Sequence, residues 1–370
     1  MRTIGLMSGT SLDGVDGVLA EFGTAGQLQV LAFASLDMPQ PLRAELLALN
    51  TPGDDELHRS ALAAIALVDL YAKVVDRLLQ SSGVAANAIA AIGAHGQTVR
   101  HRPGEFDGCG YTLQLNNPAL LAERTGIAVA ADFRSRDVAA GGQGAPLVPA
   151  FHSRFLNAAN ECMAILNIGG ISNITLLNPG GFTPVRGFDC GPGNALMDLW
   201  CQRHMGQAYD RDGAWARTGR VLASLLHDLL DEDFFRRPPP KSTGRDLFHA
   251  TWLDAKLRRH PDVATADVQA TLCALTAQSC AEALRAHHPQ CQRLLVCGGG
   301  AFNASLMEAL QQALPQVRVE STSVAGLPPQ QVEACAFAWL AAQCVKGSPG
   351  NLPEVTGARG LRVLGALYPA

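Results

Sequence analysis

The sequence has no long apolar run, no sustained block of one charge and no Cys-x-x-Cys motif. No stretch approaches the roughly 18 apolar residues that a membrane span needs, because even the apolar segment 61–70 is interrupted by Asp69. The opening residues Met1–Thr10 contain too short an apolar run for a secretory signal peptide. We therefore expect a cytoplasmic protein without a membrane segment.

Charge and cysteine usage exclude further classes of protein. The formal net charge is -4 and no basic face is clustered, which argues against a nucleic-acid-binding protein. Several of the ten cysteines lie inside apolar segments, so we expect reduced thiols in the core. The ten histidines show no metal-binding spacing.

The composition is typical of a well-buried globular enzyme, with 48% hydrophobic and 17% charged residues. At about 100–200 residues per domain, the 370 residues predict two domains. We place the first at 1–140 and the second at 141–370, although the sequence brackets the boundary only between Asp132 and Asn160. The apolar tail 361–370 is expected to pack back on one of the two, with the first as our choice.

Strands, glycine turns and helical patterns alternate along the chain, which predicts the α/β class. Strands at 3–7, 15–22 and 28–36 predict an antiparallel meander, and a helical pattern at 55–79 follows. A strand–glycine turn–strand unit at 163–177 resembles the one at the start and indicates an internal structural repeat. Helical patterns dominate the second half, at 195–204, 214–230, 251–259, 267–287, 305–314 and 330–346.

Four glycine-rich turns are spread over the two halves. In the first, Ser8–Asp16, glycines let the backbone present N–H groups to phosphate, and Asp13 is suited to holding magnesium through water. The other three are Asn167–Asn173, Phe188–Asn194 and Cys297–Asn303. Each alone is weak, since Asp-Gly is also a common hairpin turn, but the four together favour a bound nucleotide. Neither a Walker lysine motif nor Gly-x-Gly-x-x-Gly is present, which argues against P-loop and Rossmann enzymes.

Two polar segments, 95–98 and 132–137, follow predicted strands and carry groups suited to a sugar. Arg134 is suited to binding a ligand carboxylate bidentately, through two parallel hydrogen bonds. The alternative is that Arg134 forms an ion pair with a neighbouring aspartate. His95 is expected to be structural or a hydrogen-bond partner. Glu333 opens an apolar helical run, either as a charge stabilised by the helix dipole or as a ligand contact.

These motifs, in this order, resemble the anhydro-N-acetylmuramic acid kinase family. The matching segments run across essentially the whole chain: Met7–Asp16, His95–Thr98, Asp132–His152, Asn167–Asn173, Gly187–Asn194, Pro240–Arg245, Cys297–Gly300, Glu333–Leu340 and Gly350–Gly357. The resemblance implies a two-domain actin/hexokinase-like (ribonuclease H-like) fold with ATP and Mg²⁺ in an interdomain active-site cleft. Cys190 stands where threonine is common, and Asn116 stands where glycine is common and is expected to take its positive φ.

The resemblance also implies roles for residues of this chain. Asp189 matches the family's catalytic aspartate. The implied nucleotide-binding residues are Gly9, Thr10, Ser11, Leu12, Asp13, Gly14, Val15, Asp16, Gly169, Gly170, Gly298, Gly299 and Gly300. Asp13 is expected to hold Mg²⁺ through water. Thr98, Arg134 and Glu333 lie in segments that the family uses around the sugar, with Arg136 as the alternative to Arg134.

The implied reaction converts 1,6-anhydro-N-acetylmuramate, ATP and water into N-acetylmuramate 6-phosphate and ADP, in recycling of cell-wall murein. We expect a small-molecule sugar partner, no nucleic acid, no membrane and a homodimer like that of the family. Three other functions stay open. They are an ordinary sugar kinase in which Asp189 deprotonates a hydroxyl, a non-catalytic ATP-dependent switch, and a phosphatase acting on polyphosphate or nucleotides.

Overall fold

The computed structural model describes residues 1–9, 12–23, 26–158, 160–179, 184–245 and 247–370. Contacts group the chain into two compact units. Unit 1 comprises Met1–Leu156 and Gln330–Ala370, and unit 2 comprises Asn157–Pro329. The chain therefore leaves unit 1 once and returns to it. The division at residue 140 stays a prediction, and these contact-based units differ from it at both ends of unit 2.

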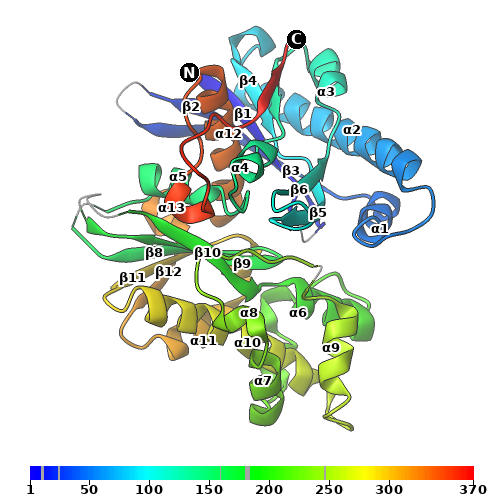
Figure 1. The fold of residues 1–370 in the computed structure, drawn as a ribbon, viewed down its shortest axis with the longest axis vertical. Coiled ribbons are helices and arrows are strands. Elements are labelled where there is room, and N and C mark those ends of the chain that lie inside the picture. The colour runs from blue at the N-terminus through cyan, green and yellow to red at the C-terminus, as the bar shows by residue number, and fades with distance from the viewer. Residues whose placement is uncertain (10–11, 24–25, 159, 180–183, 246) are drawn as a thin grey trace. The chain divides into compact units, whose positions relative to one another are not determined.

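Unit 1 is built on a six-stranded sheet with the order β13-β7-β4-β1-β2-β3 (Figure 1). The first three strands form the antiparallel meander that the sequence predicts, and β4 and β7 extend it in parallel from β1. The tail strand β13 pairs with β7, so the C-terminal tail lies in unit 1. The strands are β1 (Arg2–Met7), β2 (Gly14–Phe22), β3 (Leu28–Asp37), β4 (Ala91–Ala94), β7 (Val129–Ala131) and β13 (Ala366–Tyr368).

Helices cover this sheet, and the longest of them is α2 (Glu56–Ser82), which packs against β2 and β3. Its buried residues include Leu67, Tyr71, Val74 and Leu78, at the helical spacing that the sequence predicts. The remaining helices are α1 (Gln40–Ala48), α3 (Pro118–Thr125), α4 (Ser135–Ala139), α5 (Val148–Phe155), α12 (Val332–Val345) and α13 (Pro353–Thr356). After β4, the chain forms a hairpin of β5 (Gln97–Pro103) and β6 (Gly110–Leu115), which the sequence analysis does not predict.

Unit 2 is built on a five-stranded sheet with the order β10-β9-β8-β11-β12. Its strands are β8 (Met163–Ile168), β9 (Ile171–Leu177), β10 (Arg186–Pro192), β11 (Arg293–Cys297) and β12 (Arg318–Ser321). Its helices are α6 (Ala195–Met205), α7 (Ala223–Leu230), α8 (Asp233–Arg236), α9 (Ala250–Leu257), α10 (Thr265–His287) and α11 (Ala304–Ala313). The single helix predicted at 214–230 is wrong in its first half, because Gly219 passes so close to the Ala266 carbonyl that a β-carbon there would overlap it.

The two sheets share one strand order. Unit 1 contains β3-β2-β1-β4-β7 and unit 2 contains β10-β9-β8-β11-β12. In each, three antiparallel strands are followed by two parallel ones. The internal repeat predicted from the two strand–glycine–strand units is therefore confirmed.

Helix α12 lies in the segment that returns to unit 1, and it packs directly on the backbone of the unit 1 sheet. Gly5 on β1 and Gly93 on β4 are parallel neighbours. A β-carbon on Gly5 would overlap the Ala334 carbonyl of α12, and one on Gly93 would overlap the Phe337 carbonyl. Because this contact allows no side chain between sheet and helix, glycine is required at both positions.

All ten cysteines are free thiols and seven are buried, as the sequence predicts. Among the described residues, none of the helices combines the length and apolarity that a membrane span requires.

We expect Gly93→Ala to lower the free energy of unfolding by about 2–3 kcal/mol, because overpacking forces α12 away from the sheet. Urea unfolding measures this, with Gly53→Ala as the matched control. Gly53 is exposed and has only the flexible tip of Arg59 nearby, so its change should stay within about 0.5 kcal/mol. Equal stability of the two variants would contradict the close packing of α12.

Candidate active site

In unit 2 the second and third glycine turns of the sequence are joined through backbone hydrogen bonds. The Gly169 carbonyl accepts from the Asn194 N–H at 2.8 Å, and the Gly170 carbonyl accepts from the Gly193 N–H at 2.9 Å. A β-carbon on Gly193 would overlap the Gly169 carbonyl, so a side chain there would separate the two turns. The corner between β8 and β9 thereby lies against the start of α6.

The fourth glycine turn lies against the same corner. Gly298 has a φ of 77°, and a β-carbon there would stand 2.5 Å from Oδ1 of Asn167 and 2.6 Å from the Ile168 carbonyl. Gly300 packs just as closely on the Ile168 side chain, whereas Gly299 is more open, with the Asn194 amide 3.5 Å away. Three of the four predicted glycine turns are therefore brought together in unit 2.

Asp189 lies on β10, where the sequence predicts only a loop. The pairing of β9 with β10 shifts register between Asp189 and Gly191, which is a β-bulge. The Asp189 side chain is buried, and its Oδ2 accepts the backbone N–H of Thr243 at 2.9 Å. The backbone N–H of Asp189 in turn donates to the Lys241 carbonyl at 3.1 Å. The segment 241–243 thus holds the carboxylate in one orientation.

The buried ammonium of Lys241 supports this segment. It donates to the carbonyls of Phe234 at 3.1 Å and Phe235 at 3.3 Å, and lies 4.6 Å from the centre of the Phe234 ring. Burial lowers the pKa of Lys241, and the negative charge of Asp189 acts in the opposite direction. The sequence offers only one signal for Lys241 and Thr243, namely that the segment 240–245 matches the family pattern.

In unit 1 the first glycine turn is tied to the segment 95–98. The Ser8 hydroxyl lies 3.0 Å from the Tyr71 hydroxyl and donates to the Gly96 carbonyl at 3.0 Å. Tyr71 also accepts the Gly96 N–H at 3.1 Å, and the Gln97 amide donates to the Gly9 carbonyl at 3.2 Å. Tyr71, which the sequence shows only as an apolar helix position, therefore joins the two predicted segments.

The rest of the first glycine turn carries two carboxylates, those of Asp13 and Asp16. Asp13 is exposed, whereas burial, opposed by a hydrogen bond with Ser35 and assisted by the charge of Asp13, raises the pKa of Asp16 to about 6. Thr10 and Ser11, the predicted hydroxyl donors, lie outside the described residues. The turn enters β2 through Leu12, Gly14 and Val15.

The carboxylates of this turn fit a magnesium ion that keeps most of its water. The described residues contain no group of three or more His, Cys, Asp or Glu side chains able to hold a metal ion. Mg²⁺ in kinases needs no such cage, since it is commonly held by one or two carboxylates together with substrate phosphates. A cation beside Asp13 would also relieve the repulsion between Asp13 and Asp16.

His95 and Arg134 form a second polar centre in unit 1. The Arg134 guanidinium donates to Nε2 of His95 from Nε at 3.1 Å and from Nη2 at 3.0 Å, and its Nη1 donates to the Gly144 carbonyl at 2.8 Å. Burial, and then the positive charge of Arg134, lower the pKa of His95 to about 3. Because guanidinium nitrogens only donate, Nε2 is unprotonated and His95 is a neutral acceptor.

The other residues predicted around the sugar are Glu333, Thr98 and Arg136, and they differ in their position relative to His95 and Arg134. The His95 ring packs 4.7 Å from that of Phe337. Glu333 precedes Phe337 by four residues on α12 and therefore lies on the same helix face. Thr98 is half-buried on β5, whereas Arg136 is exposed on α4. The structure thus brings Arg134, rather than Arg136, to His95.

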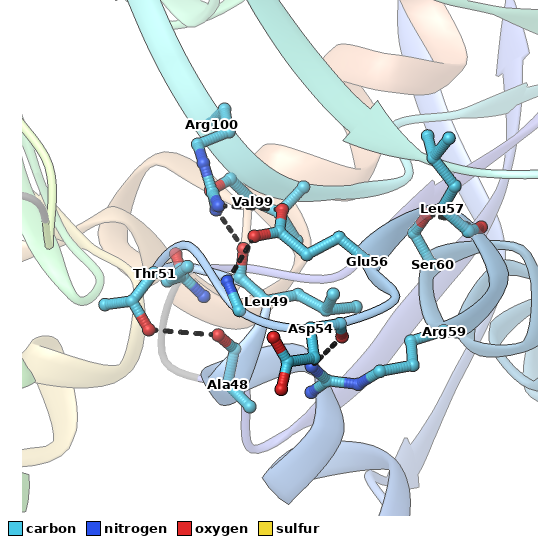
Figure 2. Close-up of polar contacts among 12 residues, drawn as sticks. Ala48, Leu49, Thr51, Asp54, Glu56, Leu57, Arg59, Ser60, Val99 and Arg100 are labelled. Atoms are coloured by element: carbon cyan, nitrogen blue, oxygen red, sulfur yellow. Dashed lines mark hydrogen bonds and ion pairs between the residues drawn. The ribbon is translucent and has the colours of Figure 1, made fainter.

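Strand β5, which carries Thr98, is anchored to the connection between α1 and α2. Figure 2 shows Arg100 extending from β5 to Glu56 and to the Leu49 carbonyl. The Arg100 Nη2 to Glu56 Oε2 distance is 3.0 Å, and the Arg100 side chain is only 13% exposed. Arg59 donates to the Asp54 carbonyl at 3.1 Å in the same connection. These contacts fix the strand next to the predicted sugar residue.

The Gly144 carbonyl that receives Arg134 is itself held by a buried carboxylate. Asp137 is fully buried and accepts the Gly144 N–H at 2.8 Å, the Asn351 amide at 2.8 Å and the Thr356 hydroxyl at 2.9 Å. The sequence alone also allowed an ion pair between Arg134 and a neighbouring aspartate. The hydrogen bonds of Asp137 described here instead come from Gly144, Asn351 and Thr356. The structure uses Asp137 to join the segments 137–144 and 351–356.

Comparison with known proteins points to one family. A family model described as "Anhydro-N-acetylmuramic acid kinase" matches residues 1–370. A protein of that name from Variovorax paradoxus (strain S110) is 60% identical over 370 residues, covering 99% of this chain and 98% of its own. Another from Bordetella petrii is also 60% identical over 370 residues, covering 99% of this chain and 96% of its own.

Among solved structures, the chain resembles component A of the (R)-2-hydroxyglutaryl-CoA dehydratase of Acidaminococcus fermentans. The TM-score is 0.50 at 13% sequence identity, over 94% of this chain and 99% of that chain. At this identity the likeness shows the fold alone. Together with the repeated sheets, it confirms the two-domain actin/hexokinase-like class predicted from the sequence.

We expect the free energy of unfolding to decrease as the pH falls from 6.5 toward 3. Below 6.5 the unfolded chain protonates His95, whereas in the folded chain its pKa is about 3, so protons favour unfolding. One such histidine contributes a slope of at most about 1.4 kcal/mol per pH unit. His95→Gln keeps an acceptor for Arg134 but does not titrate, so its urea-unfolding free energy should depend less on pH. An unchanged slope would contradict the buried neutral state, and His58→Gln, at an exposed site, is the control.

Proposed function

The chain belongs to the anhydro-N-acetylmuramic acid kinase family, and from this premise we propose that it opens 1,6-anhydro-N-acetylmuramate with water and phosphorylates oxygen 6 at the expense of ATP. The products are N-acetylmuramate 6-phosphate and ADP. We further propose a cytoplasmic location, because ATP is available there, and a homodimer, which the family resemblance implies.

The single observation that carries this proposal beyond the family match is the setting of Asp189. The carboxylate is buried on β10, and Thr243 holds one of its oxygens through a backbone N–H. A buried carboxylate in a fixed orientation is suited to general-base catalysis, which contributes roughly 10²–10⁴-fold to a rate.

The glycine turns supply the nucleotide-binding groups. We assign phosphate binding to the turn that begins at Gly9 and to the corner at Gly169 and Gly170, and binding of the nucleoside to Gly298–Gly300. The close backbone packing at Gly298 and the open surface at Gly299 support the last assignment. Mg²⁺ held through water by Asp13 would neutralise charge on the transferring phosphoryl group.

The acidic lactyl group of the sugar requires a cation, and we assign this role to Arg134. Its guanidinium is held by His95 and Gly144, so little side-chain freedom is lost when an anion binds. Thr98 and Glu333 complete the proposed sugar-binding set.

The proposed reaction couples two bond changes. Asp189 accepts a proton from water, the water oxygen bonds to the anomeric carbon, and the bond from that carbon to oxygen 6 breaks. Oxygen 6 takes the γ-phosphoryl group and ADP leaves. Incubation with ATP, magnesium and the anhydro-sugar in water containing heavy oxygen tests this directly. We expect a 6-phosphate product with one heavy oxygen at the anomeric carbon.

The other outcomes of that experiment distinguish the alternatives. A phosphorylated sugar that keeps its anhydro bridge indicates an ordinary sugar kinase. ATP binding without a sugar product indicates a switch, and phosphate release without sugar indicates a phosphatase.

We expect Asp189→Asn to lower turnover by roughly 10²–10⁴-fold, because the amide cannot accept the proton while its oxygen can still receive the Thr243 N–H. Steady-state kinetics and ATP-binding calorimetry measure the two effects, and ATP affinity should be retained. Asp254→Asn, at a surface ion pair with Arg203, is the matched control. Near-normal turnover in Asp189→Asn would exclude Asp189 as the base.

We expect Arg134→Lys to raise the KM for the anhydro-sugar by about tenfold or more and to leave the KM for ATP nearly unchanged. An ammonium cannot hold His95 and Gly144 and also present a planar pair of donors. The matched control is Arg136→Lys, on the exposed side of α4. A larger effect at Arg136 than at Arg134 would reverse the assignment.

A further inference from the structure

Three polar side chains form a row across the sheet of unit 2. Asn167 on β8 pairs with Asn173 on β9, and Asn173 pairs with Asp189 on β10. Residues directly opposite each other on antiparallel strands point to the same face of a sheet. The neighbours that point the other way belong to the apolar core of unit 2, namely Leu166, Ile168, Ile174 and Phe188. The row therefore lies on the face away from that core.

Asn173 is the middle member of this row, and its amide oxygen is the atom of interest. Its Oδ1 is buried and has no hydrogen-bond partner among the described residues. By contrast, Oδ2 of Asp189 receives the Thr243 N–H, and Oδ1 of Asn167 lies 3.7 Å from the Cys297 sulfur. A buried amide oxygen without a donor destabilises the fold, so its persistence beside Asp189 points to a donor supplied by a ligand.

We propose that Asn173 binds the attacking water jointly with Asp189. This inference rests on the proposed function, in which Asp189 is the base. Side chains directly opposite on antiparallel strands have β-carbons about 4.5–5.5 Å apart, a span that a single water molecule can bridge. One O–H of the water donates to the Asp189 carboxylate, and the other donates to Oδ1 of Asn173.

This arrangement determines which part of the water is available for reaction. With both hydrogens engaged, only oxygen lone pairs face the sugar. The proton on the Asp189 side transfers to the carboxylate as the oxygen bonds to the anomeric carbon, and the bond to oxygen 6 breaks as that oxygen takes the γ-phosphoryl group. Asn173 keeps its hydrogen bond throughout and gains or loses no proton.

The β-bulge supports the pairing. Asp189 is the last regularly paired residue of β10 before the shift at Gly191. Bulges next to active sites re-aim side chains and end regular pairing. Asp189 and Asn173 are thus the final matched pair of this ladder before it becomes irregular.

The first test changes the nucleophile. Methanol has one O–H group, so in the wild type it would leave Oδ1 of Asn173 facing a methyl group. We expect the wild type in dilute methanol to form almost only N-acetylmuramate 6-phosphate. In Asn173→Ala we expect kcat to fall about threefold to tenfold, because one neutral hydrogen bond to the reacting water is lost. The ratio of the methyl glycoside 6-phosphate to N-acetylmuramate 6-phosphate should rise severalfold, because the variant has no amide oxygen that would face the methyl group of methanol.

The second test uses a variant of the same shape. Asn173→Asp places a second carboxylate beside Asp189 and should raise its pKa, so the acidic limb of the kcat profile should shift to higher pH. The variant remains informative if Asn173→Ala does not fold. The matched control is Asn178→Ala, because Asn178 directly follows the end of β9. This variant should change neither the ratio of methyl glycoside to hydrolysis product nor the pH profile of kcat.

The outcomes separate this inference from the function on which it rests. If the wild type forms no N-acetylmuramate 6-phosphate, the proposed function fails. If the wild type is active and Asn173→Ala keeps both its kcat and its product ratio, only the role of Asn173 is overturned. An unshifted pH profile in a folded, active Asn173→Asp would overturn it as well.

Discussion

Helix α12 can approach β1 and β4 only because Gly5 and Gly93 have no side chains, and the setting of Arg134 in unit 1 builds on this contact. The contact places Phe337 against the His95 ring. His95 then receives two N–H groups from Arg134. A residue near the C-terminal end of the chain thereby helps to orient an arginine more than two hundred residues earlier in the sequence. Close backbone packing, rather than a network of charges, is the basis of this arrangement.

The electrostatics of the two units follow a common rule, in which backbone groups or neutral side chains orient the charged residue. In unit 1, neutral His95 and the Gly144 carbonyl hold Arg134. In unit 2, the Thr243 N–H holds Asp189. These hydrogen bonds restrict the orientation of each charged group, because a donor and an acceptor in fixed positions favour one rotamer of the side chain.

Much of the fold was accessible from the sequence, because strands and helices with strong periodicity are set by local patterns. The meander of β1–β3, the helix α2 and the repeat at residue 163 are all of this kind. The hairpin β5–β6 was not predicted, because its strands are polar and lack clear alternation. Nor could periodicity reveal that Asp189 lies on a strand, since Gly191 and Gly193 next to it are typical of turns.

The site was predictable in part, for a related reason. Glycine turns are visible as motifs, but the residues that hold them are visible only in space, as Tyr71 and Asp137 show. Asn116 was expected to take a positive φ in place of glycine, and this is wrong. It is not among the described residues with positive φ, and its side chain instead donates to the Ala94 carbonyl and accepts the Asn117 N–H.

Cys190, the other departure from the family pattern, shows why the site tolerates change beside its central residue. Successive residues of a strand point to opposite faces, so Cys190 enters the apolar core while Asp189 lies on the face of Asn173. The thiol is buried among apolar side chains, and burial raises its pKa well above the ordinary value, so it stays neutral. The substitution therefore changes core packing and adds no charge beside the carboxylate. Because the Asp189 carboxylate is oriented by the Thr243 backbone, its geometry depends little on which small side chain occupies position 190.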